Sequence, residues 1–304
     1  MGAFGAVMGL AGLGLSARAA ATVFPGVLRA PAYFTELWVV LGLAALCALL
    51  SGYFLKLILY PAAVREDFTN PATLGFCGAL PVGTSLVAGG IAPYSPFIGD
   101  LLWWAGCALL FGFQVWALVR WLSGGIELAR LNAGWLIILV GGIVVPGPGI
   151  ALGHIEASRF FFGVSASIAP LLTALLLYRA MAAAPLPEAL RPSWFILLVP
   201  PSLIYANGVA LFSLEFLEIL YFSGLVLALA LLVYARNFLR WPFAPSWWAF
   251  TFPLDALAYA AARYAQGHPS LPWTLLAAAA LAVATFFVVV ALWKTARSAA
   301  SRAA

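Results

Sequence analysis

The chain alternates between long apolar stretches and short connections that carry most of its charge. Ten stretches are long enough to cross the hydrocarbon core of a membrane, which takes roughly 20 apolar residues per helix. They cover residues 2–20, 33–61, 69–92, 97–122, 131–152, 157–182, 190–212, 214–239, 246–266 and 270–294. The pattern predicts an all-α membrane protein with ten transmembrane helices. Because little chain is left outside these stretches, we expect a single transmembrane domain over residues 1–304.

Helix breakers separate the odd-numbered stretches from the even-numbered ones. Among the even-numbered stretches, Phe216 to Leu239 and Trp273 to Trp293 are long and uninterrupted, whereas the third, fifth, seventh and ninth contain Pro81, Pro146, Pro200 and Pro253. A proline inside a helix frees a backbone carbonyl, which in hydrocarbon needs a neighbouring helix or a cavity as its partner. We therefore expect the odd-numbered helices to form an inner ring and the even-numbered helices to face lipid.

Four of the odd-numbered stretches open with similar short sequences, at intervals of 62, 59 and 53 residues. They are Asn70-Pro71-Ala72-Thr73, Asn132-Ala133-Gly134-Trp135, Arg191-Pro192-Ser193-Trp194 and Ala244-Pro245-Ser246-Trp247. Together with the first stretch, this repeat predicts five helical hairpins that all run in the same direction. Such hairpins would surround a central pore with quasi-five-fold symmetry.

The basic residues predict the orientation of the chain. Of the 15 Lys and Arg residues, eleven follow even-numbered stretches or lie in the C-terminal tail. Because cytoplasmic connections carry the excess of basic residues, both termini are expected in the cytoplasm. Met1 runs into the first stretch without a basic leader, which predicts an uncleaved span. The expected location is a bacterial inner membrane.

Composition excludes several classes of protein. A chain that is 65% hydrophobic and 8% charged is too apolar for a soluble domain. Its net charge of +5 is scattered at the ends of the stretches, which favours contact with the lipid bilayer over nucleic acid. The three cysteines lie inside apolar stretches, and His154 and His268 have no neighbouring ligand cluster in the sequence. We expect no metal, no cofactor and no enzyme activity.

Several short motifs resemble one family of membrane proteins. They are the openings Asn70-Pro71 and Pro192-Ser193-Trp194, the run Trp247-Trp248-Ala249-Phe250-Thr251-Phe252, and Arg159-Phe160-Phe161-Phe162-Gly163. They are similar to motifs of the tellurite-resistance/dicarboxylate transporter family, which includes the plant slow anion channels, fungal sulfite exporters and yeast malate permease. The resemblance implies ten helices in five hairpins, a homotrimer, and a phenylalanine on the ninth helix that occludes the pore. By its position in the motif, that phenylalanine corresponds to Phe252.

The chain departs from the family pattern in two places. Asp255 stands where small residues are usual, and the first stretch has Phe4-Gly5-Ala6-Val7 without the usual proline, so a straighter first helix is expected. With about 100° per residue, Asp255 and Tyr259 lie within about 60° of Phe252, and they would line or flank the same path. Asp255 could bind a proton, pair with Arg263 or another basic group, or cap the backbone freed near Pro253.

Two further groups of residues are candidates for contact with an anion. The inner helices would all begin on the cytoplasmic side, where their dipoles are positive, and Arg65, Arg130, Arg191 and Arg240 lie near those starts. Small polar side chains on the inner helices could solvate an ion or form hydrogen bonds between helices. The candidates for this role are Thr73, Thr84, Ser85, Ser202, Tyr205, Asn207 and Thr251.

Three functions remain open from the sequence. The first is an anion channel or facilitative transporter for small inorganic or organic anions, with a pore through the odd-numbered helices that Phe252 occludes. The second is a proton-coupled carrier of C4-dicarboxylates or of oxyanions such as tellurite or sulfite, with Asp255 taking the proton. The third is a membrane-embedded structural or enzyme subunit. No motif indicates which anion is transported.

Overall fold

The computed structural model describes residues 1–24 and 32–303, and within them the chain is helical and contains no strand. The odd-numbered stretches appear as α1 (Gly5–Ala21); α4 (Pro71–Leu74), η2 (Gly75–Gly78) and α5 (Ala79–Ile91); α7 (Gly134–Val140), η4 (Gly141–Ile143) and α8 (Pro146–Ala151); η5 (Glu188–Leu198) and α10 (Val199–Phe212); η8 (Pro245–Phe250) and α12 (Thr251–Gly267), where η denotes a 3-10 helix. The even-numbered stretches are α2 (Ala32–Leu59), α6 (Pro96–Leu122), α9 (Ile155–Ala182), α11 (Glu218–Tyr234) and α13 (Leu271–Ala303).

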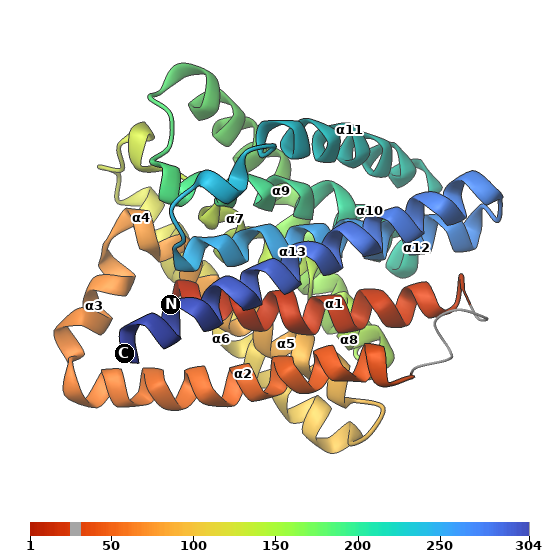
Figure 1. The fold of residues 1–304 in the computed structure, drawn as a ribbon, viewed down its shortest axis with the longest axis horizontal. Coiled ribbons are helices and arrows are strands. Elements are labelled where there is room, and N and C mark those ends of the chain that lie inside the picture. Colours follow the sequence, from red (N-terminus) through yellow and green to blue (C-terminus); the bar gives the residue numbers. More distant parts are fainter. Residues whose placement is uncertain (25–31, 304) are drawn as a thin grey trace.

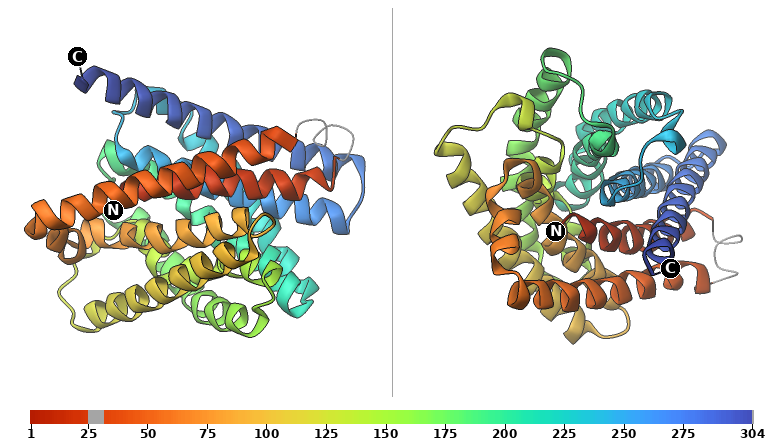
Figure 2. Two further views of the ribbon diagram at one scale, coloured as in Figure 1. Left: turned by 90° about the horizontal axis from the view of Figure 1, so that it is seen from below. Right: turned by 60° about the vertical axis from the view of Figure 1, so that its left-hand side comes forward.

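The five odd-numbered segments close into a ring, called the inner ring below. Helix α1 packs against α5 and α12, α5 packs against α8, and α10 packs against both α8 and α12. Each even-numbered helix packs on the inner segment that precedes it in the chain, so the predicted five hairpins are present. The segments of the ring begin at the end where both chain termini lie, on the left of Figure 1. We call this the amino end of the ring and the opposite one the carboxyl end; Figure 2 turns the amino end toward the viewer in its right-hand panel.

Burial confirms the predicted division between inner and outer helices. In the four most apolar inner segments, 67 to 83% of the residues in the membrane-spanning window are buried, compared with 22 to 33% in the outer helices. Many apolar side chains on the outer helices are exposed, as contact with lipid requires. The ring is therefore enclosed by protein on its outer side.

Nine helices in residues 1–24 and 32–303 are long and apolar enough to cross a membrane. The tenth predicted span, formed by η8 and α12, is less apolar because it carries Asp255, Arg263 and Gln266. It lies between α1, α10 and α13, which replace lipid as its surroundings. A helix in that position can carry polar side chains that a lipid-facing helix cannot.

The predicted breaks fall just before the prolines. In the inner segments after α1, a 3-10 turn precedes the α-helix, and Pro81, Pro146, Pro200 and Pro253 each occupy one of the first three positions of that helix. In the first turn of a helix the backbone N–H has no partner within the helix, so a proline loses nothing there. Helix α1 is continuous from Gly5, as the absence of a proline predicts.

Neighbouring helices satisfy the backbone at the break before Pro146. The Gln114 side-chain amide on α6 donates to the Leu139 carbonyl at 3.1 Å. The Asn207 amide on α10 donates to the Ile143 carbonyl at 2.7 Å. The freed carbonyls thus find partners in the protein, which is the condition that membrane depth imposes.

Three details differ from the sequence prediction or lie outside it. Residues Pro61–Thr69 form a separate helix, α3, where a simple connection was expected, with Pro61 at its first position. Helix α13 continues to Ala303, beyond the predicted end at residue 294, because its last turns are rich in alanine. Arg29, one of the charges used for the orientation, lies outside the described residues.

Candidate functional site

Two cavities lie along the axis of the inner ring, one toward each end. The amino-end cavity has a volume of about 330 Å³ and the carboxyl-end cavity about 350 Å³. All five segments of the ring contribute side chains to each cavity. Among the described residues, Phe252 and Val144 alone line both. These two residues therefore stand between the cavities.

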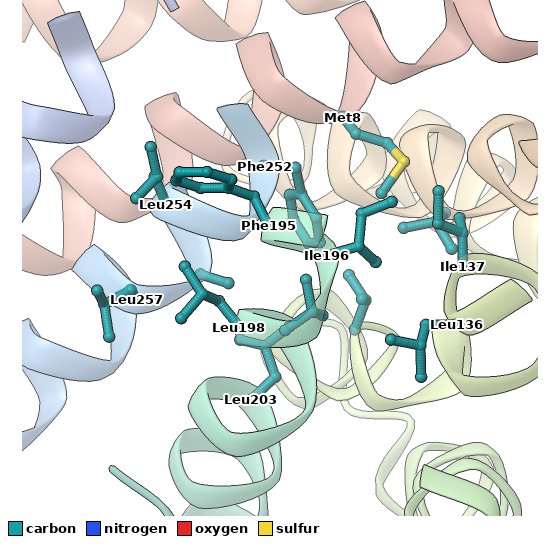
Figure 3. Packing of buried hydrophobic residues seen from close by; sticks show 14 of the residues in the cluster. Met8, Leu136, Ile137, Phe195, Ile196, Leu198, Leu203, Phe252, Leu254 and Leu257 are labelled. Carbon is teal, nitrogen blue, oxygen red and sulfur yellow. The ribbon is translucent and has the colours of Figure 1, made fainter. Parts of the chain in front are cut away.

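The constriction at Phe252 is apolar. Its ring is 5% exposed and lies beside Ile196, with Met8 and Ile137 on facing elements (Figure 3). These four side chains come from four different segments of the ring, and all line the amino-end cavity. An apolar constriction of this kind excludes water and with it hydrated ions. The geometry suits a barrier made of side chains alone.

Two glycines allow α1 to approach the segment that carries Phe252. A Cβ atom added at Gly12 would lie 2.9 Å from Cδ2 of Phe252, and one added at Gly9 would lie 2.0 Å from Oγ1 of Thr251. Real Cβ atoms essentially never come this close to another atom, so only glycine fits both positions without a shift. The position of the Phe252 ring is thus set by the backbone of α1.

Asp255 is fully buried between α12 and α1 and lines neither cavity. The Ser16 hydroxyl donates to the backbone carbonyl of Asp255 at 2.7 Å, but neither carboxyl oxygen has a hydrogen-bond partner among the described residues. Arg263 donates instead to Gln266 at 3.2 Å. Of the alternatives for Asp255, neither the pairing with Arg263 nor the capping of the backbone is present in this structure.

The polar candidates divide into three groups. Thr73 lines the amino-end cavity, and Tyr259 and Asn207 line the carboxyl-end cavity. Thr84, Ser202 and Thr251 are buried and line neither cavity. The hydroxyls of Thr84 and Thr251 donate to backbone carbonyls three or four residues earlier, a common arrangement for threonine in helices. The Ser202 hydroxyl faces α11 instead of the axis.

The four arginines expected to attract anions lie at the amino end but line neither cavity. Arg65, Arg130 and Arg240 are exposed, and Arg191 is partly buried. Arg130 and Arg191 each form an ion pair with the glutamate three residues earlier, at 3.4 and 2.9 Å. The paired glutamates therefore weaken the positive potential that Arg130 and Arg191 produce at the axis.

The sequence reading did not single out Asp67, which lines the amino-end cavity. The Lys56 ammonium group lies 2.7 Å from its carboxylate, and the Tyr53 hydroxyl donates to it at 3.1 Å. Burial raises the pKa of Asp67, but the hydrogen bond from Lys56 and the other favourable contacts outweigh it and lower the pKa below the usual range. A carboxylate that is paired in this way repels anions less than a free one.

Arg18, in the last turn of α1, lines the carboxyl-end cavity and was also missed. Its Nη2 atom lies 2.6 Å from Oε2 of Glu36 on α2. In the sequence Arg18 was counted only as a charge at the end of a span. A basic residue near the end of an odd-numbered stretch and an acidic residue early in the next one are compatible with such an ion pair, but the sequence does not place the pair at the axis.

The histidines and cysteines form no cluster in the described part of the chain. His154 hydrogen-bonds to Asp100, and His268 lies 3.6 Å from Glu218, both at carboxyl-end connections. The three cysteines are free thiols. In residues 1–24 and 32–303 no group of three or more His, Cys, Asp or Glu side chains could hold a metal ion.

Comparisons with known proteins all match this chain to channels or transporters. A family model described as "SLAC1: Voltage-dependent anion channel" matches residues 1–296. The S-type anion channel SLAH3 of Arabidopsis thaliana is 28% identical over 94% of this chain, and the guard cell S-type anion channel SLAC1 of the same plant is 24% identical over 82% of it. Each match covers 46% of the plant protein, so the chain spans about half the length of these relatives. An uncharacterized transporter of Methanocaldococcus jannaschii is 28% identical over 66% of this chain and 67% of its own length.

Proposed function

We infer that this chain, which belongs to the SLAC1 family of voltage-dependent anion channels, conducts anions through the axis of its inner ring and that Phe252 occludes this path. Members of the family are anion channels or transporters and not enzymes, which sets aside a membrane-embedded enzyme subunit. The observation that carries the proposal is the pair of cavities on the ring axis, whose linings share Phe252 and Val144 and no other described residue.

The direction of the inner segments supports an anion as the permeant ion. All five segments begin at the amino end, so their helix dipoles place about half a positive charge each around the amino-end cavity. Anions are drawn to such a cavity without a dedicated basic side chain. We place the amino end in the cytoplasm, because eleven of the 15 basic residues lie on that side.

The lining of the two cavities supports passive movement. Most of the lining side chains are apolar, and few polar groups converge on any one point. Conduction requires that an ion bind weakly enough to leave again. A lumen without a tight polar binding site meets this requirement.

Reversal potentials of the purified protein in planar bilayers test the proposal. With unequal salt on the two sides, currents are expected to reverse at the equilibrium potential of the anion and to be insensitive to a pH difference. Replacing chloride by nitrate, sulfite or malate then ranks the permeant anions. Currents that reverse at the cation potential would reject the proposal.

A second candidate, a proton-coupled carrier of C4-dicarboxylates or oxyanions, is favoured by one observation. The Asp255 carboxyl group is buried near the Phe252 ring, and neither of its oxygens has a hydrogen-bond partner in the part of the chain that the structure describes, so it is available to bind a proton. A carrier of this kind takes up malate, sulfite or tellurite into proteoliposomes when the outside is acidic, and Asp255→Asn abolishes the uptake. Uptake that ignores both the proton gradient and the substitution favours the channel.

The resemblance also implies a homotrimer, and we propose that the exposed apolar faces of the outer helices provide its contacts. The mass of the purified protein in detergent, corrected for bound detergent, measures the oligomeric state.

A further inference from the structure

We propose that Arg18 sets the preference of the pore for anions at its carboxyl end, with Glu36 as the opposing charge that tunes it. The inference rests on the proposed function and names a residue that controls selectivity at the same path. Among the described residues that line the two cavities, Arg18 is the only arginine or lysine.

The carboxyl end is where a path of this design most needs a positive charge. Because all five segments run in the same direction, their carbonyl ends surround the carboxyl-end cavity. The dipoles there are negative and repel the anions that the amino end attracts. Without a compensating charge, an anion would meet an electrostatic barrier at this mouth.

Arg18 lies against the carbonyl groups that create this barrier. Its Nη1 atom donates to the carbonyl of Gly89 at 3.3 Å, and Nη2 donates to the carbonyl of Gly90 at 2.9 Å, both near the end of α5. Arg18 also occupies the last turn of its own helix, α1. One guanidinium group therefore compensates the carbonyl ends of two segments of the ring.

Glu36 holds the guanidinium group from outside the ring. The Nε and Nη2 atoms of Arg18 donate to the two carboxylate oxygens at 3.1 and 2.6 Å. Such bidentate pairs fix the planar geometry of both groups. Glu36 lines neither cavity, so the pair points its positive end at the path and its negative end away from it. Both side chains are less than one-third exposed, so solvent screens this field only in part.

Selectivity measured in the Phe252→Ala background tests the inference, because the wider pore gives larger currents. The readout is the anion-to-cation permeability ratio, from reversal potentials in a potassium chloride gradient. We expect Arg18→Gln to lower the ratio by about fivefold, since a unit charge near the lumen is removed and Glu36 is left unopposed. Glu36→Gln is expected to raise the ratio by a similar factor.

A charge exchange separates the field from the stability of the ion pair. In Arg18→Glu/Glu36→Arg the pair can still form, but the carboxylate now faces the cavity, and the ratio is expected to fall below that of Arg18→Gln. Arg159→Gln is the matched control. Arg159 lies at the carboxyl end, pairs with Glu156 at 2.7 Å and lines neither cavity, so its removal leaves the ratio unchanged.

The outcomes distinguish this inference from the proposed function. If the Phe252→Ala protein conducts anions but neither Glu36→Gln nor the charge exchange changes the ratio, the role of Arg18 is rejected and the pore stands. If the Phe252→Ala protein itself conducts no anions, both fail. If Arg18→Gln does not fold, Glu36→Gln still tests the role of Arg18 in selectivity, because this variant keeps the arginine and its contacts with the carbonyl groups.

Discussion

Gly12 of α1 lies so close to the ring of Phe252 that a methyl group added at Gly12 would be 2.9 Å from Cδ2 of the ring. The same methyl group would lie 3.0 Å from Oδ2 of Asp255. The Phe252 ring and the buried carboxyl group of Asp255 therefore share one contact on the neighbouring helix. A movement of α1 at Gly12 reaches both.

Removing the ring at the constriction is expected to open the path. Phe252→Ala should raise single-channel conductance by about tenfold or more, which corresponds to a barrier lower by about 1.4 kcal/mol. Single-channel recording in planar bilayers measures the change. Phe250→Leu is the control, because Phe250 is also buried but lines neither cavity. A conductance that stays the same in Phe252→Ala would exclude Phe252 as the barrier.

Gly12→Ala is expected to press the ring further toward the axis. The added methyl group meets the edge of the ring, which has free space on both sides, so the ring can move at little loss of stability. We expect a lower conductance in the otherwise unchanged protein and no effect in the Phe252→Ala background. An equal effect in both backgrounds contradicts the contact as the cause.

Gly9→Ala, on the same helix as Gly12, is expected to lower the stability of the protein. Its methyl group would lie 2.0 Å from Oγ1 and 2.6 Å from Cβ of Thr251, so the two helices must separate. We expect a loss of about 1–3 kcal/mol, the usual range for overpacking. Thermal unfolding in detergent measures it, and a loss no larger than that of Gly12→Ala contradicts the reasoning.

Asn207 supports the break before Pro146, so its loss should destabilise the fold. In Asn207→Leu the buried carbonyl of Ile143 loses the amide that donates to it at 2.7 Å, which costs about 1–3 kcal/mol. Ser202→Ala on the same helix is the control, because the Ser202 hydroxyl is buried and has no hydrogen-bond partner among the described residues. We expect that control to be neutral or slightly stabilising. Equal losses in the two variants would show that the bond to Ile143 is not the cause.

Asp67 makes stability depend on pH. Because its pKa is lowered in the folded protein, the ionised form stabilises the fold. This contribution is complete above the unfolded-state pKa of about 4 and disappears as the pH falls through the lower, folded-state value. At pH 7 we expect Asp67→Asn to lower the free energy of unfolding by about 1 kcal/mol, measured as a lower unfolding temperature. The difference from the unchanged protein is expected to shrink below about pH 4.

The control for Asp67 is Glu127→Gln. Glu127 forms an exposed ion pair with Arg130 at 3.4 Å, and exposed pairs contribute little. A difference between Asp67→Asn and the unchanged protein that persists unchanged below about pH 3 would contradict ionisation as its source.

The fold could be predicted from the sequence because the membrane leaves few options. A backbone in hydrocarbon must form its hydrogen bonds within the protein, so the length of each apolar stretch predicts a helix. Pro81, Pro146, Pro200 and Pro253 all lie in inner segments, although the outer helix α9 also contains an internal proline, Pro170. The 3-10 turns before the four inner prolines were not predictable in the same way. The geometry of these turns depends on how neighbouring segments pack, and that packing cannot be predicted from the local sequence.

Part of the site could be predicted from the angular positions of residues around α12. From helical periodicity, Tyr259 lies about 20° and Asp255 about 60° from Phe252 around α12. In the structure Tyr259 lines the cavity, whereas Asp255 lies under α1. Arg18 was missed because its place at the mouth follows from the approach of α2 and α5, which no local pattern specifies.

The uniform direction of the five hairpins has a mechanical consequence. Transporters with inverted repeats can change the side to which they open by letting two halves exchange shapes across a two-fold axis in the membrane plane. A ring of parallel repeats has no such axis, so inward-open and outward-open forms of this molecule would not be related by a rotation about an axis in the membrane plane. Under the proposed function, the path opens when one side chain turns, and neither half of the protein has to tilt against the other.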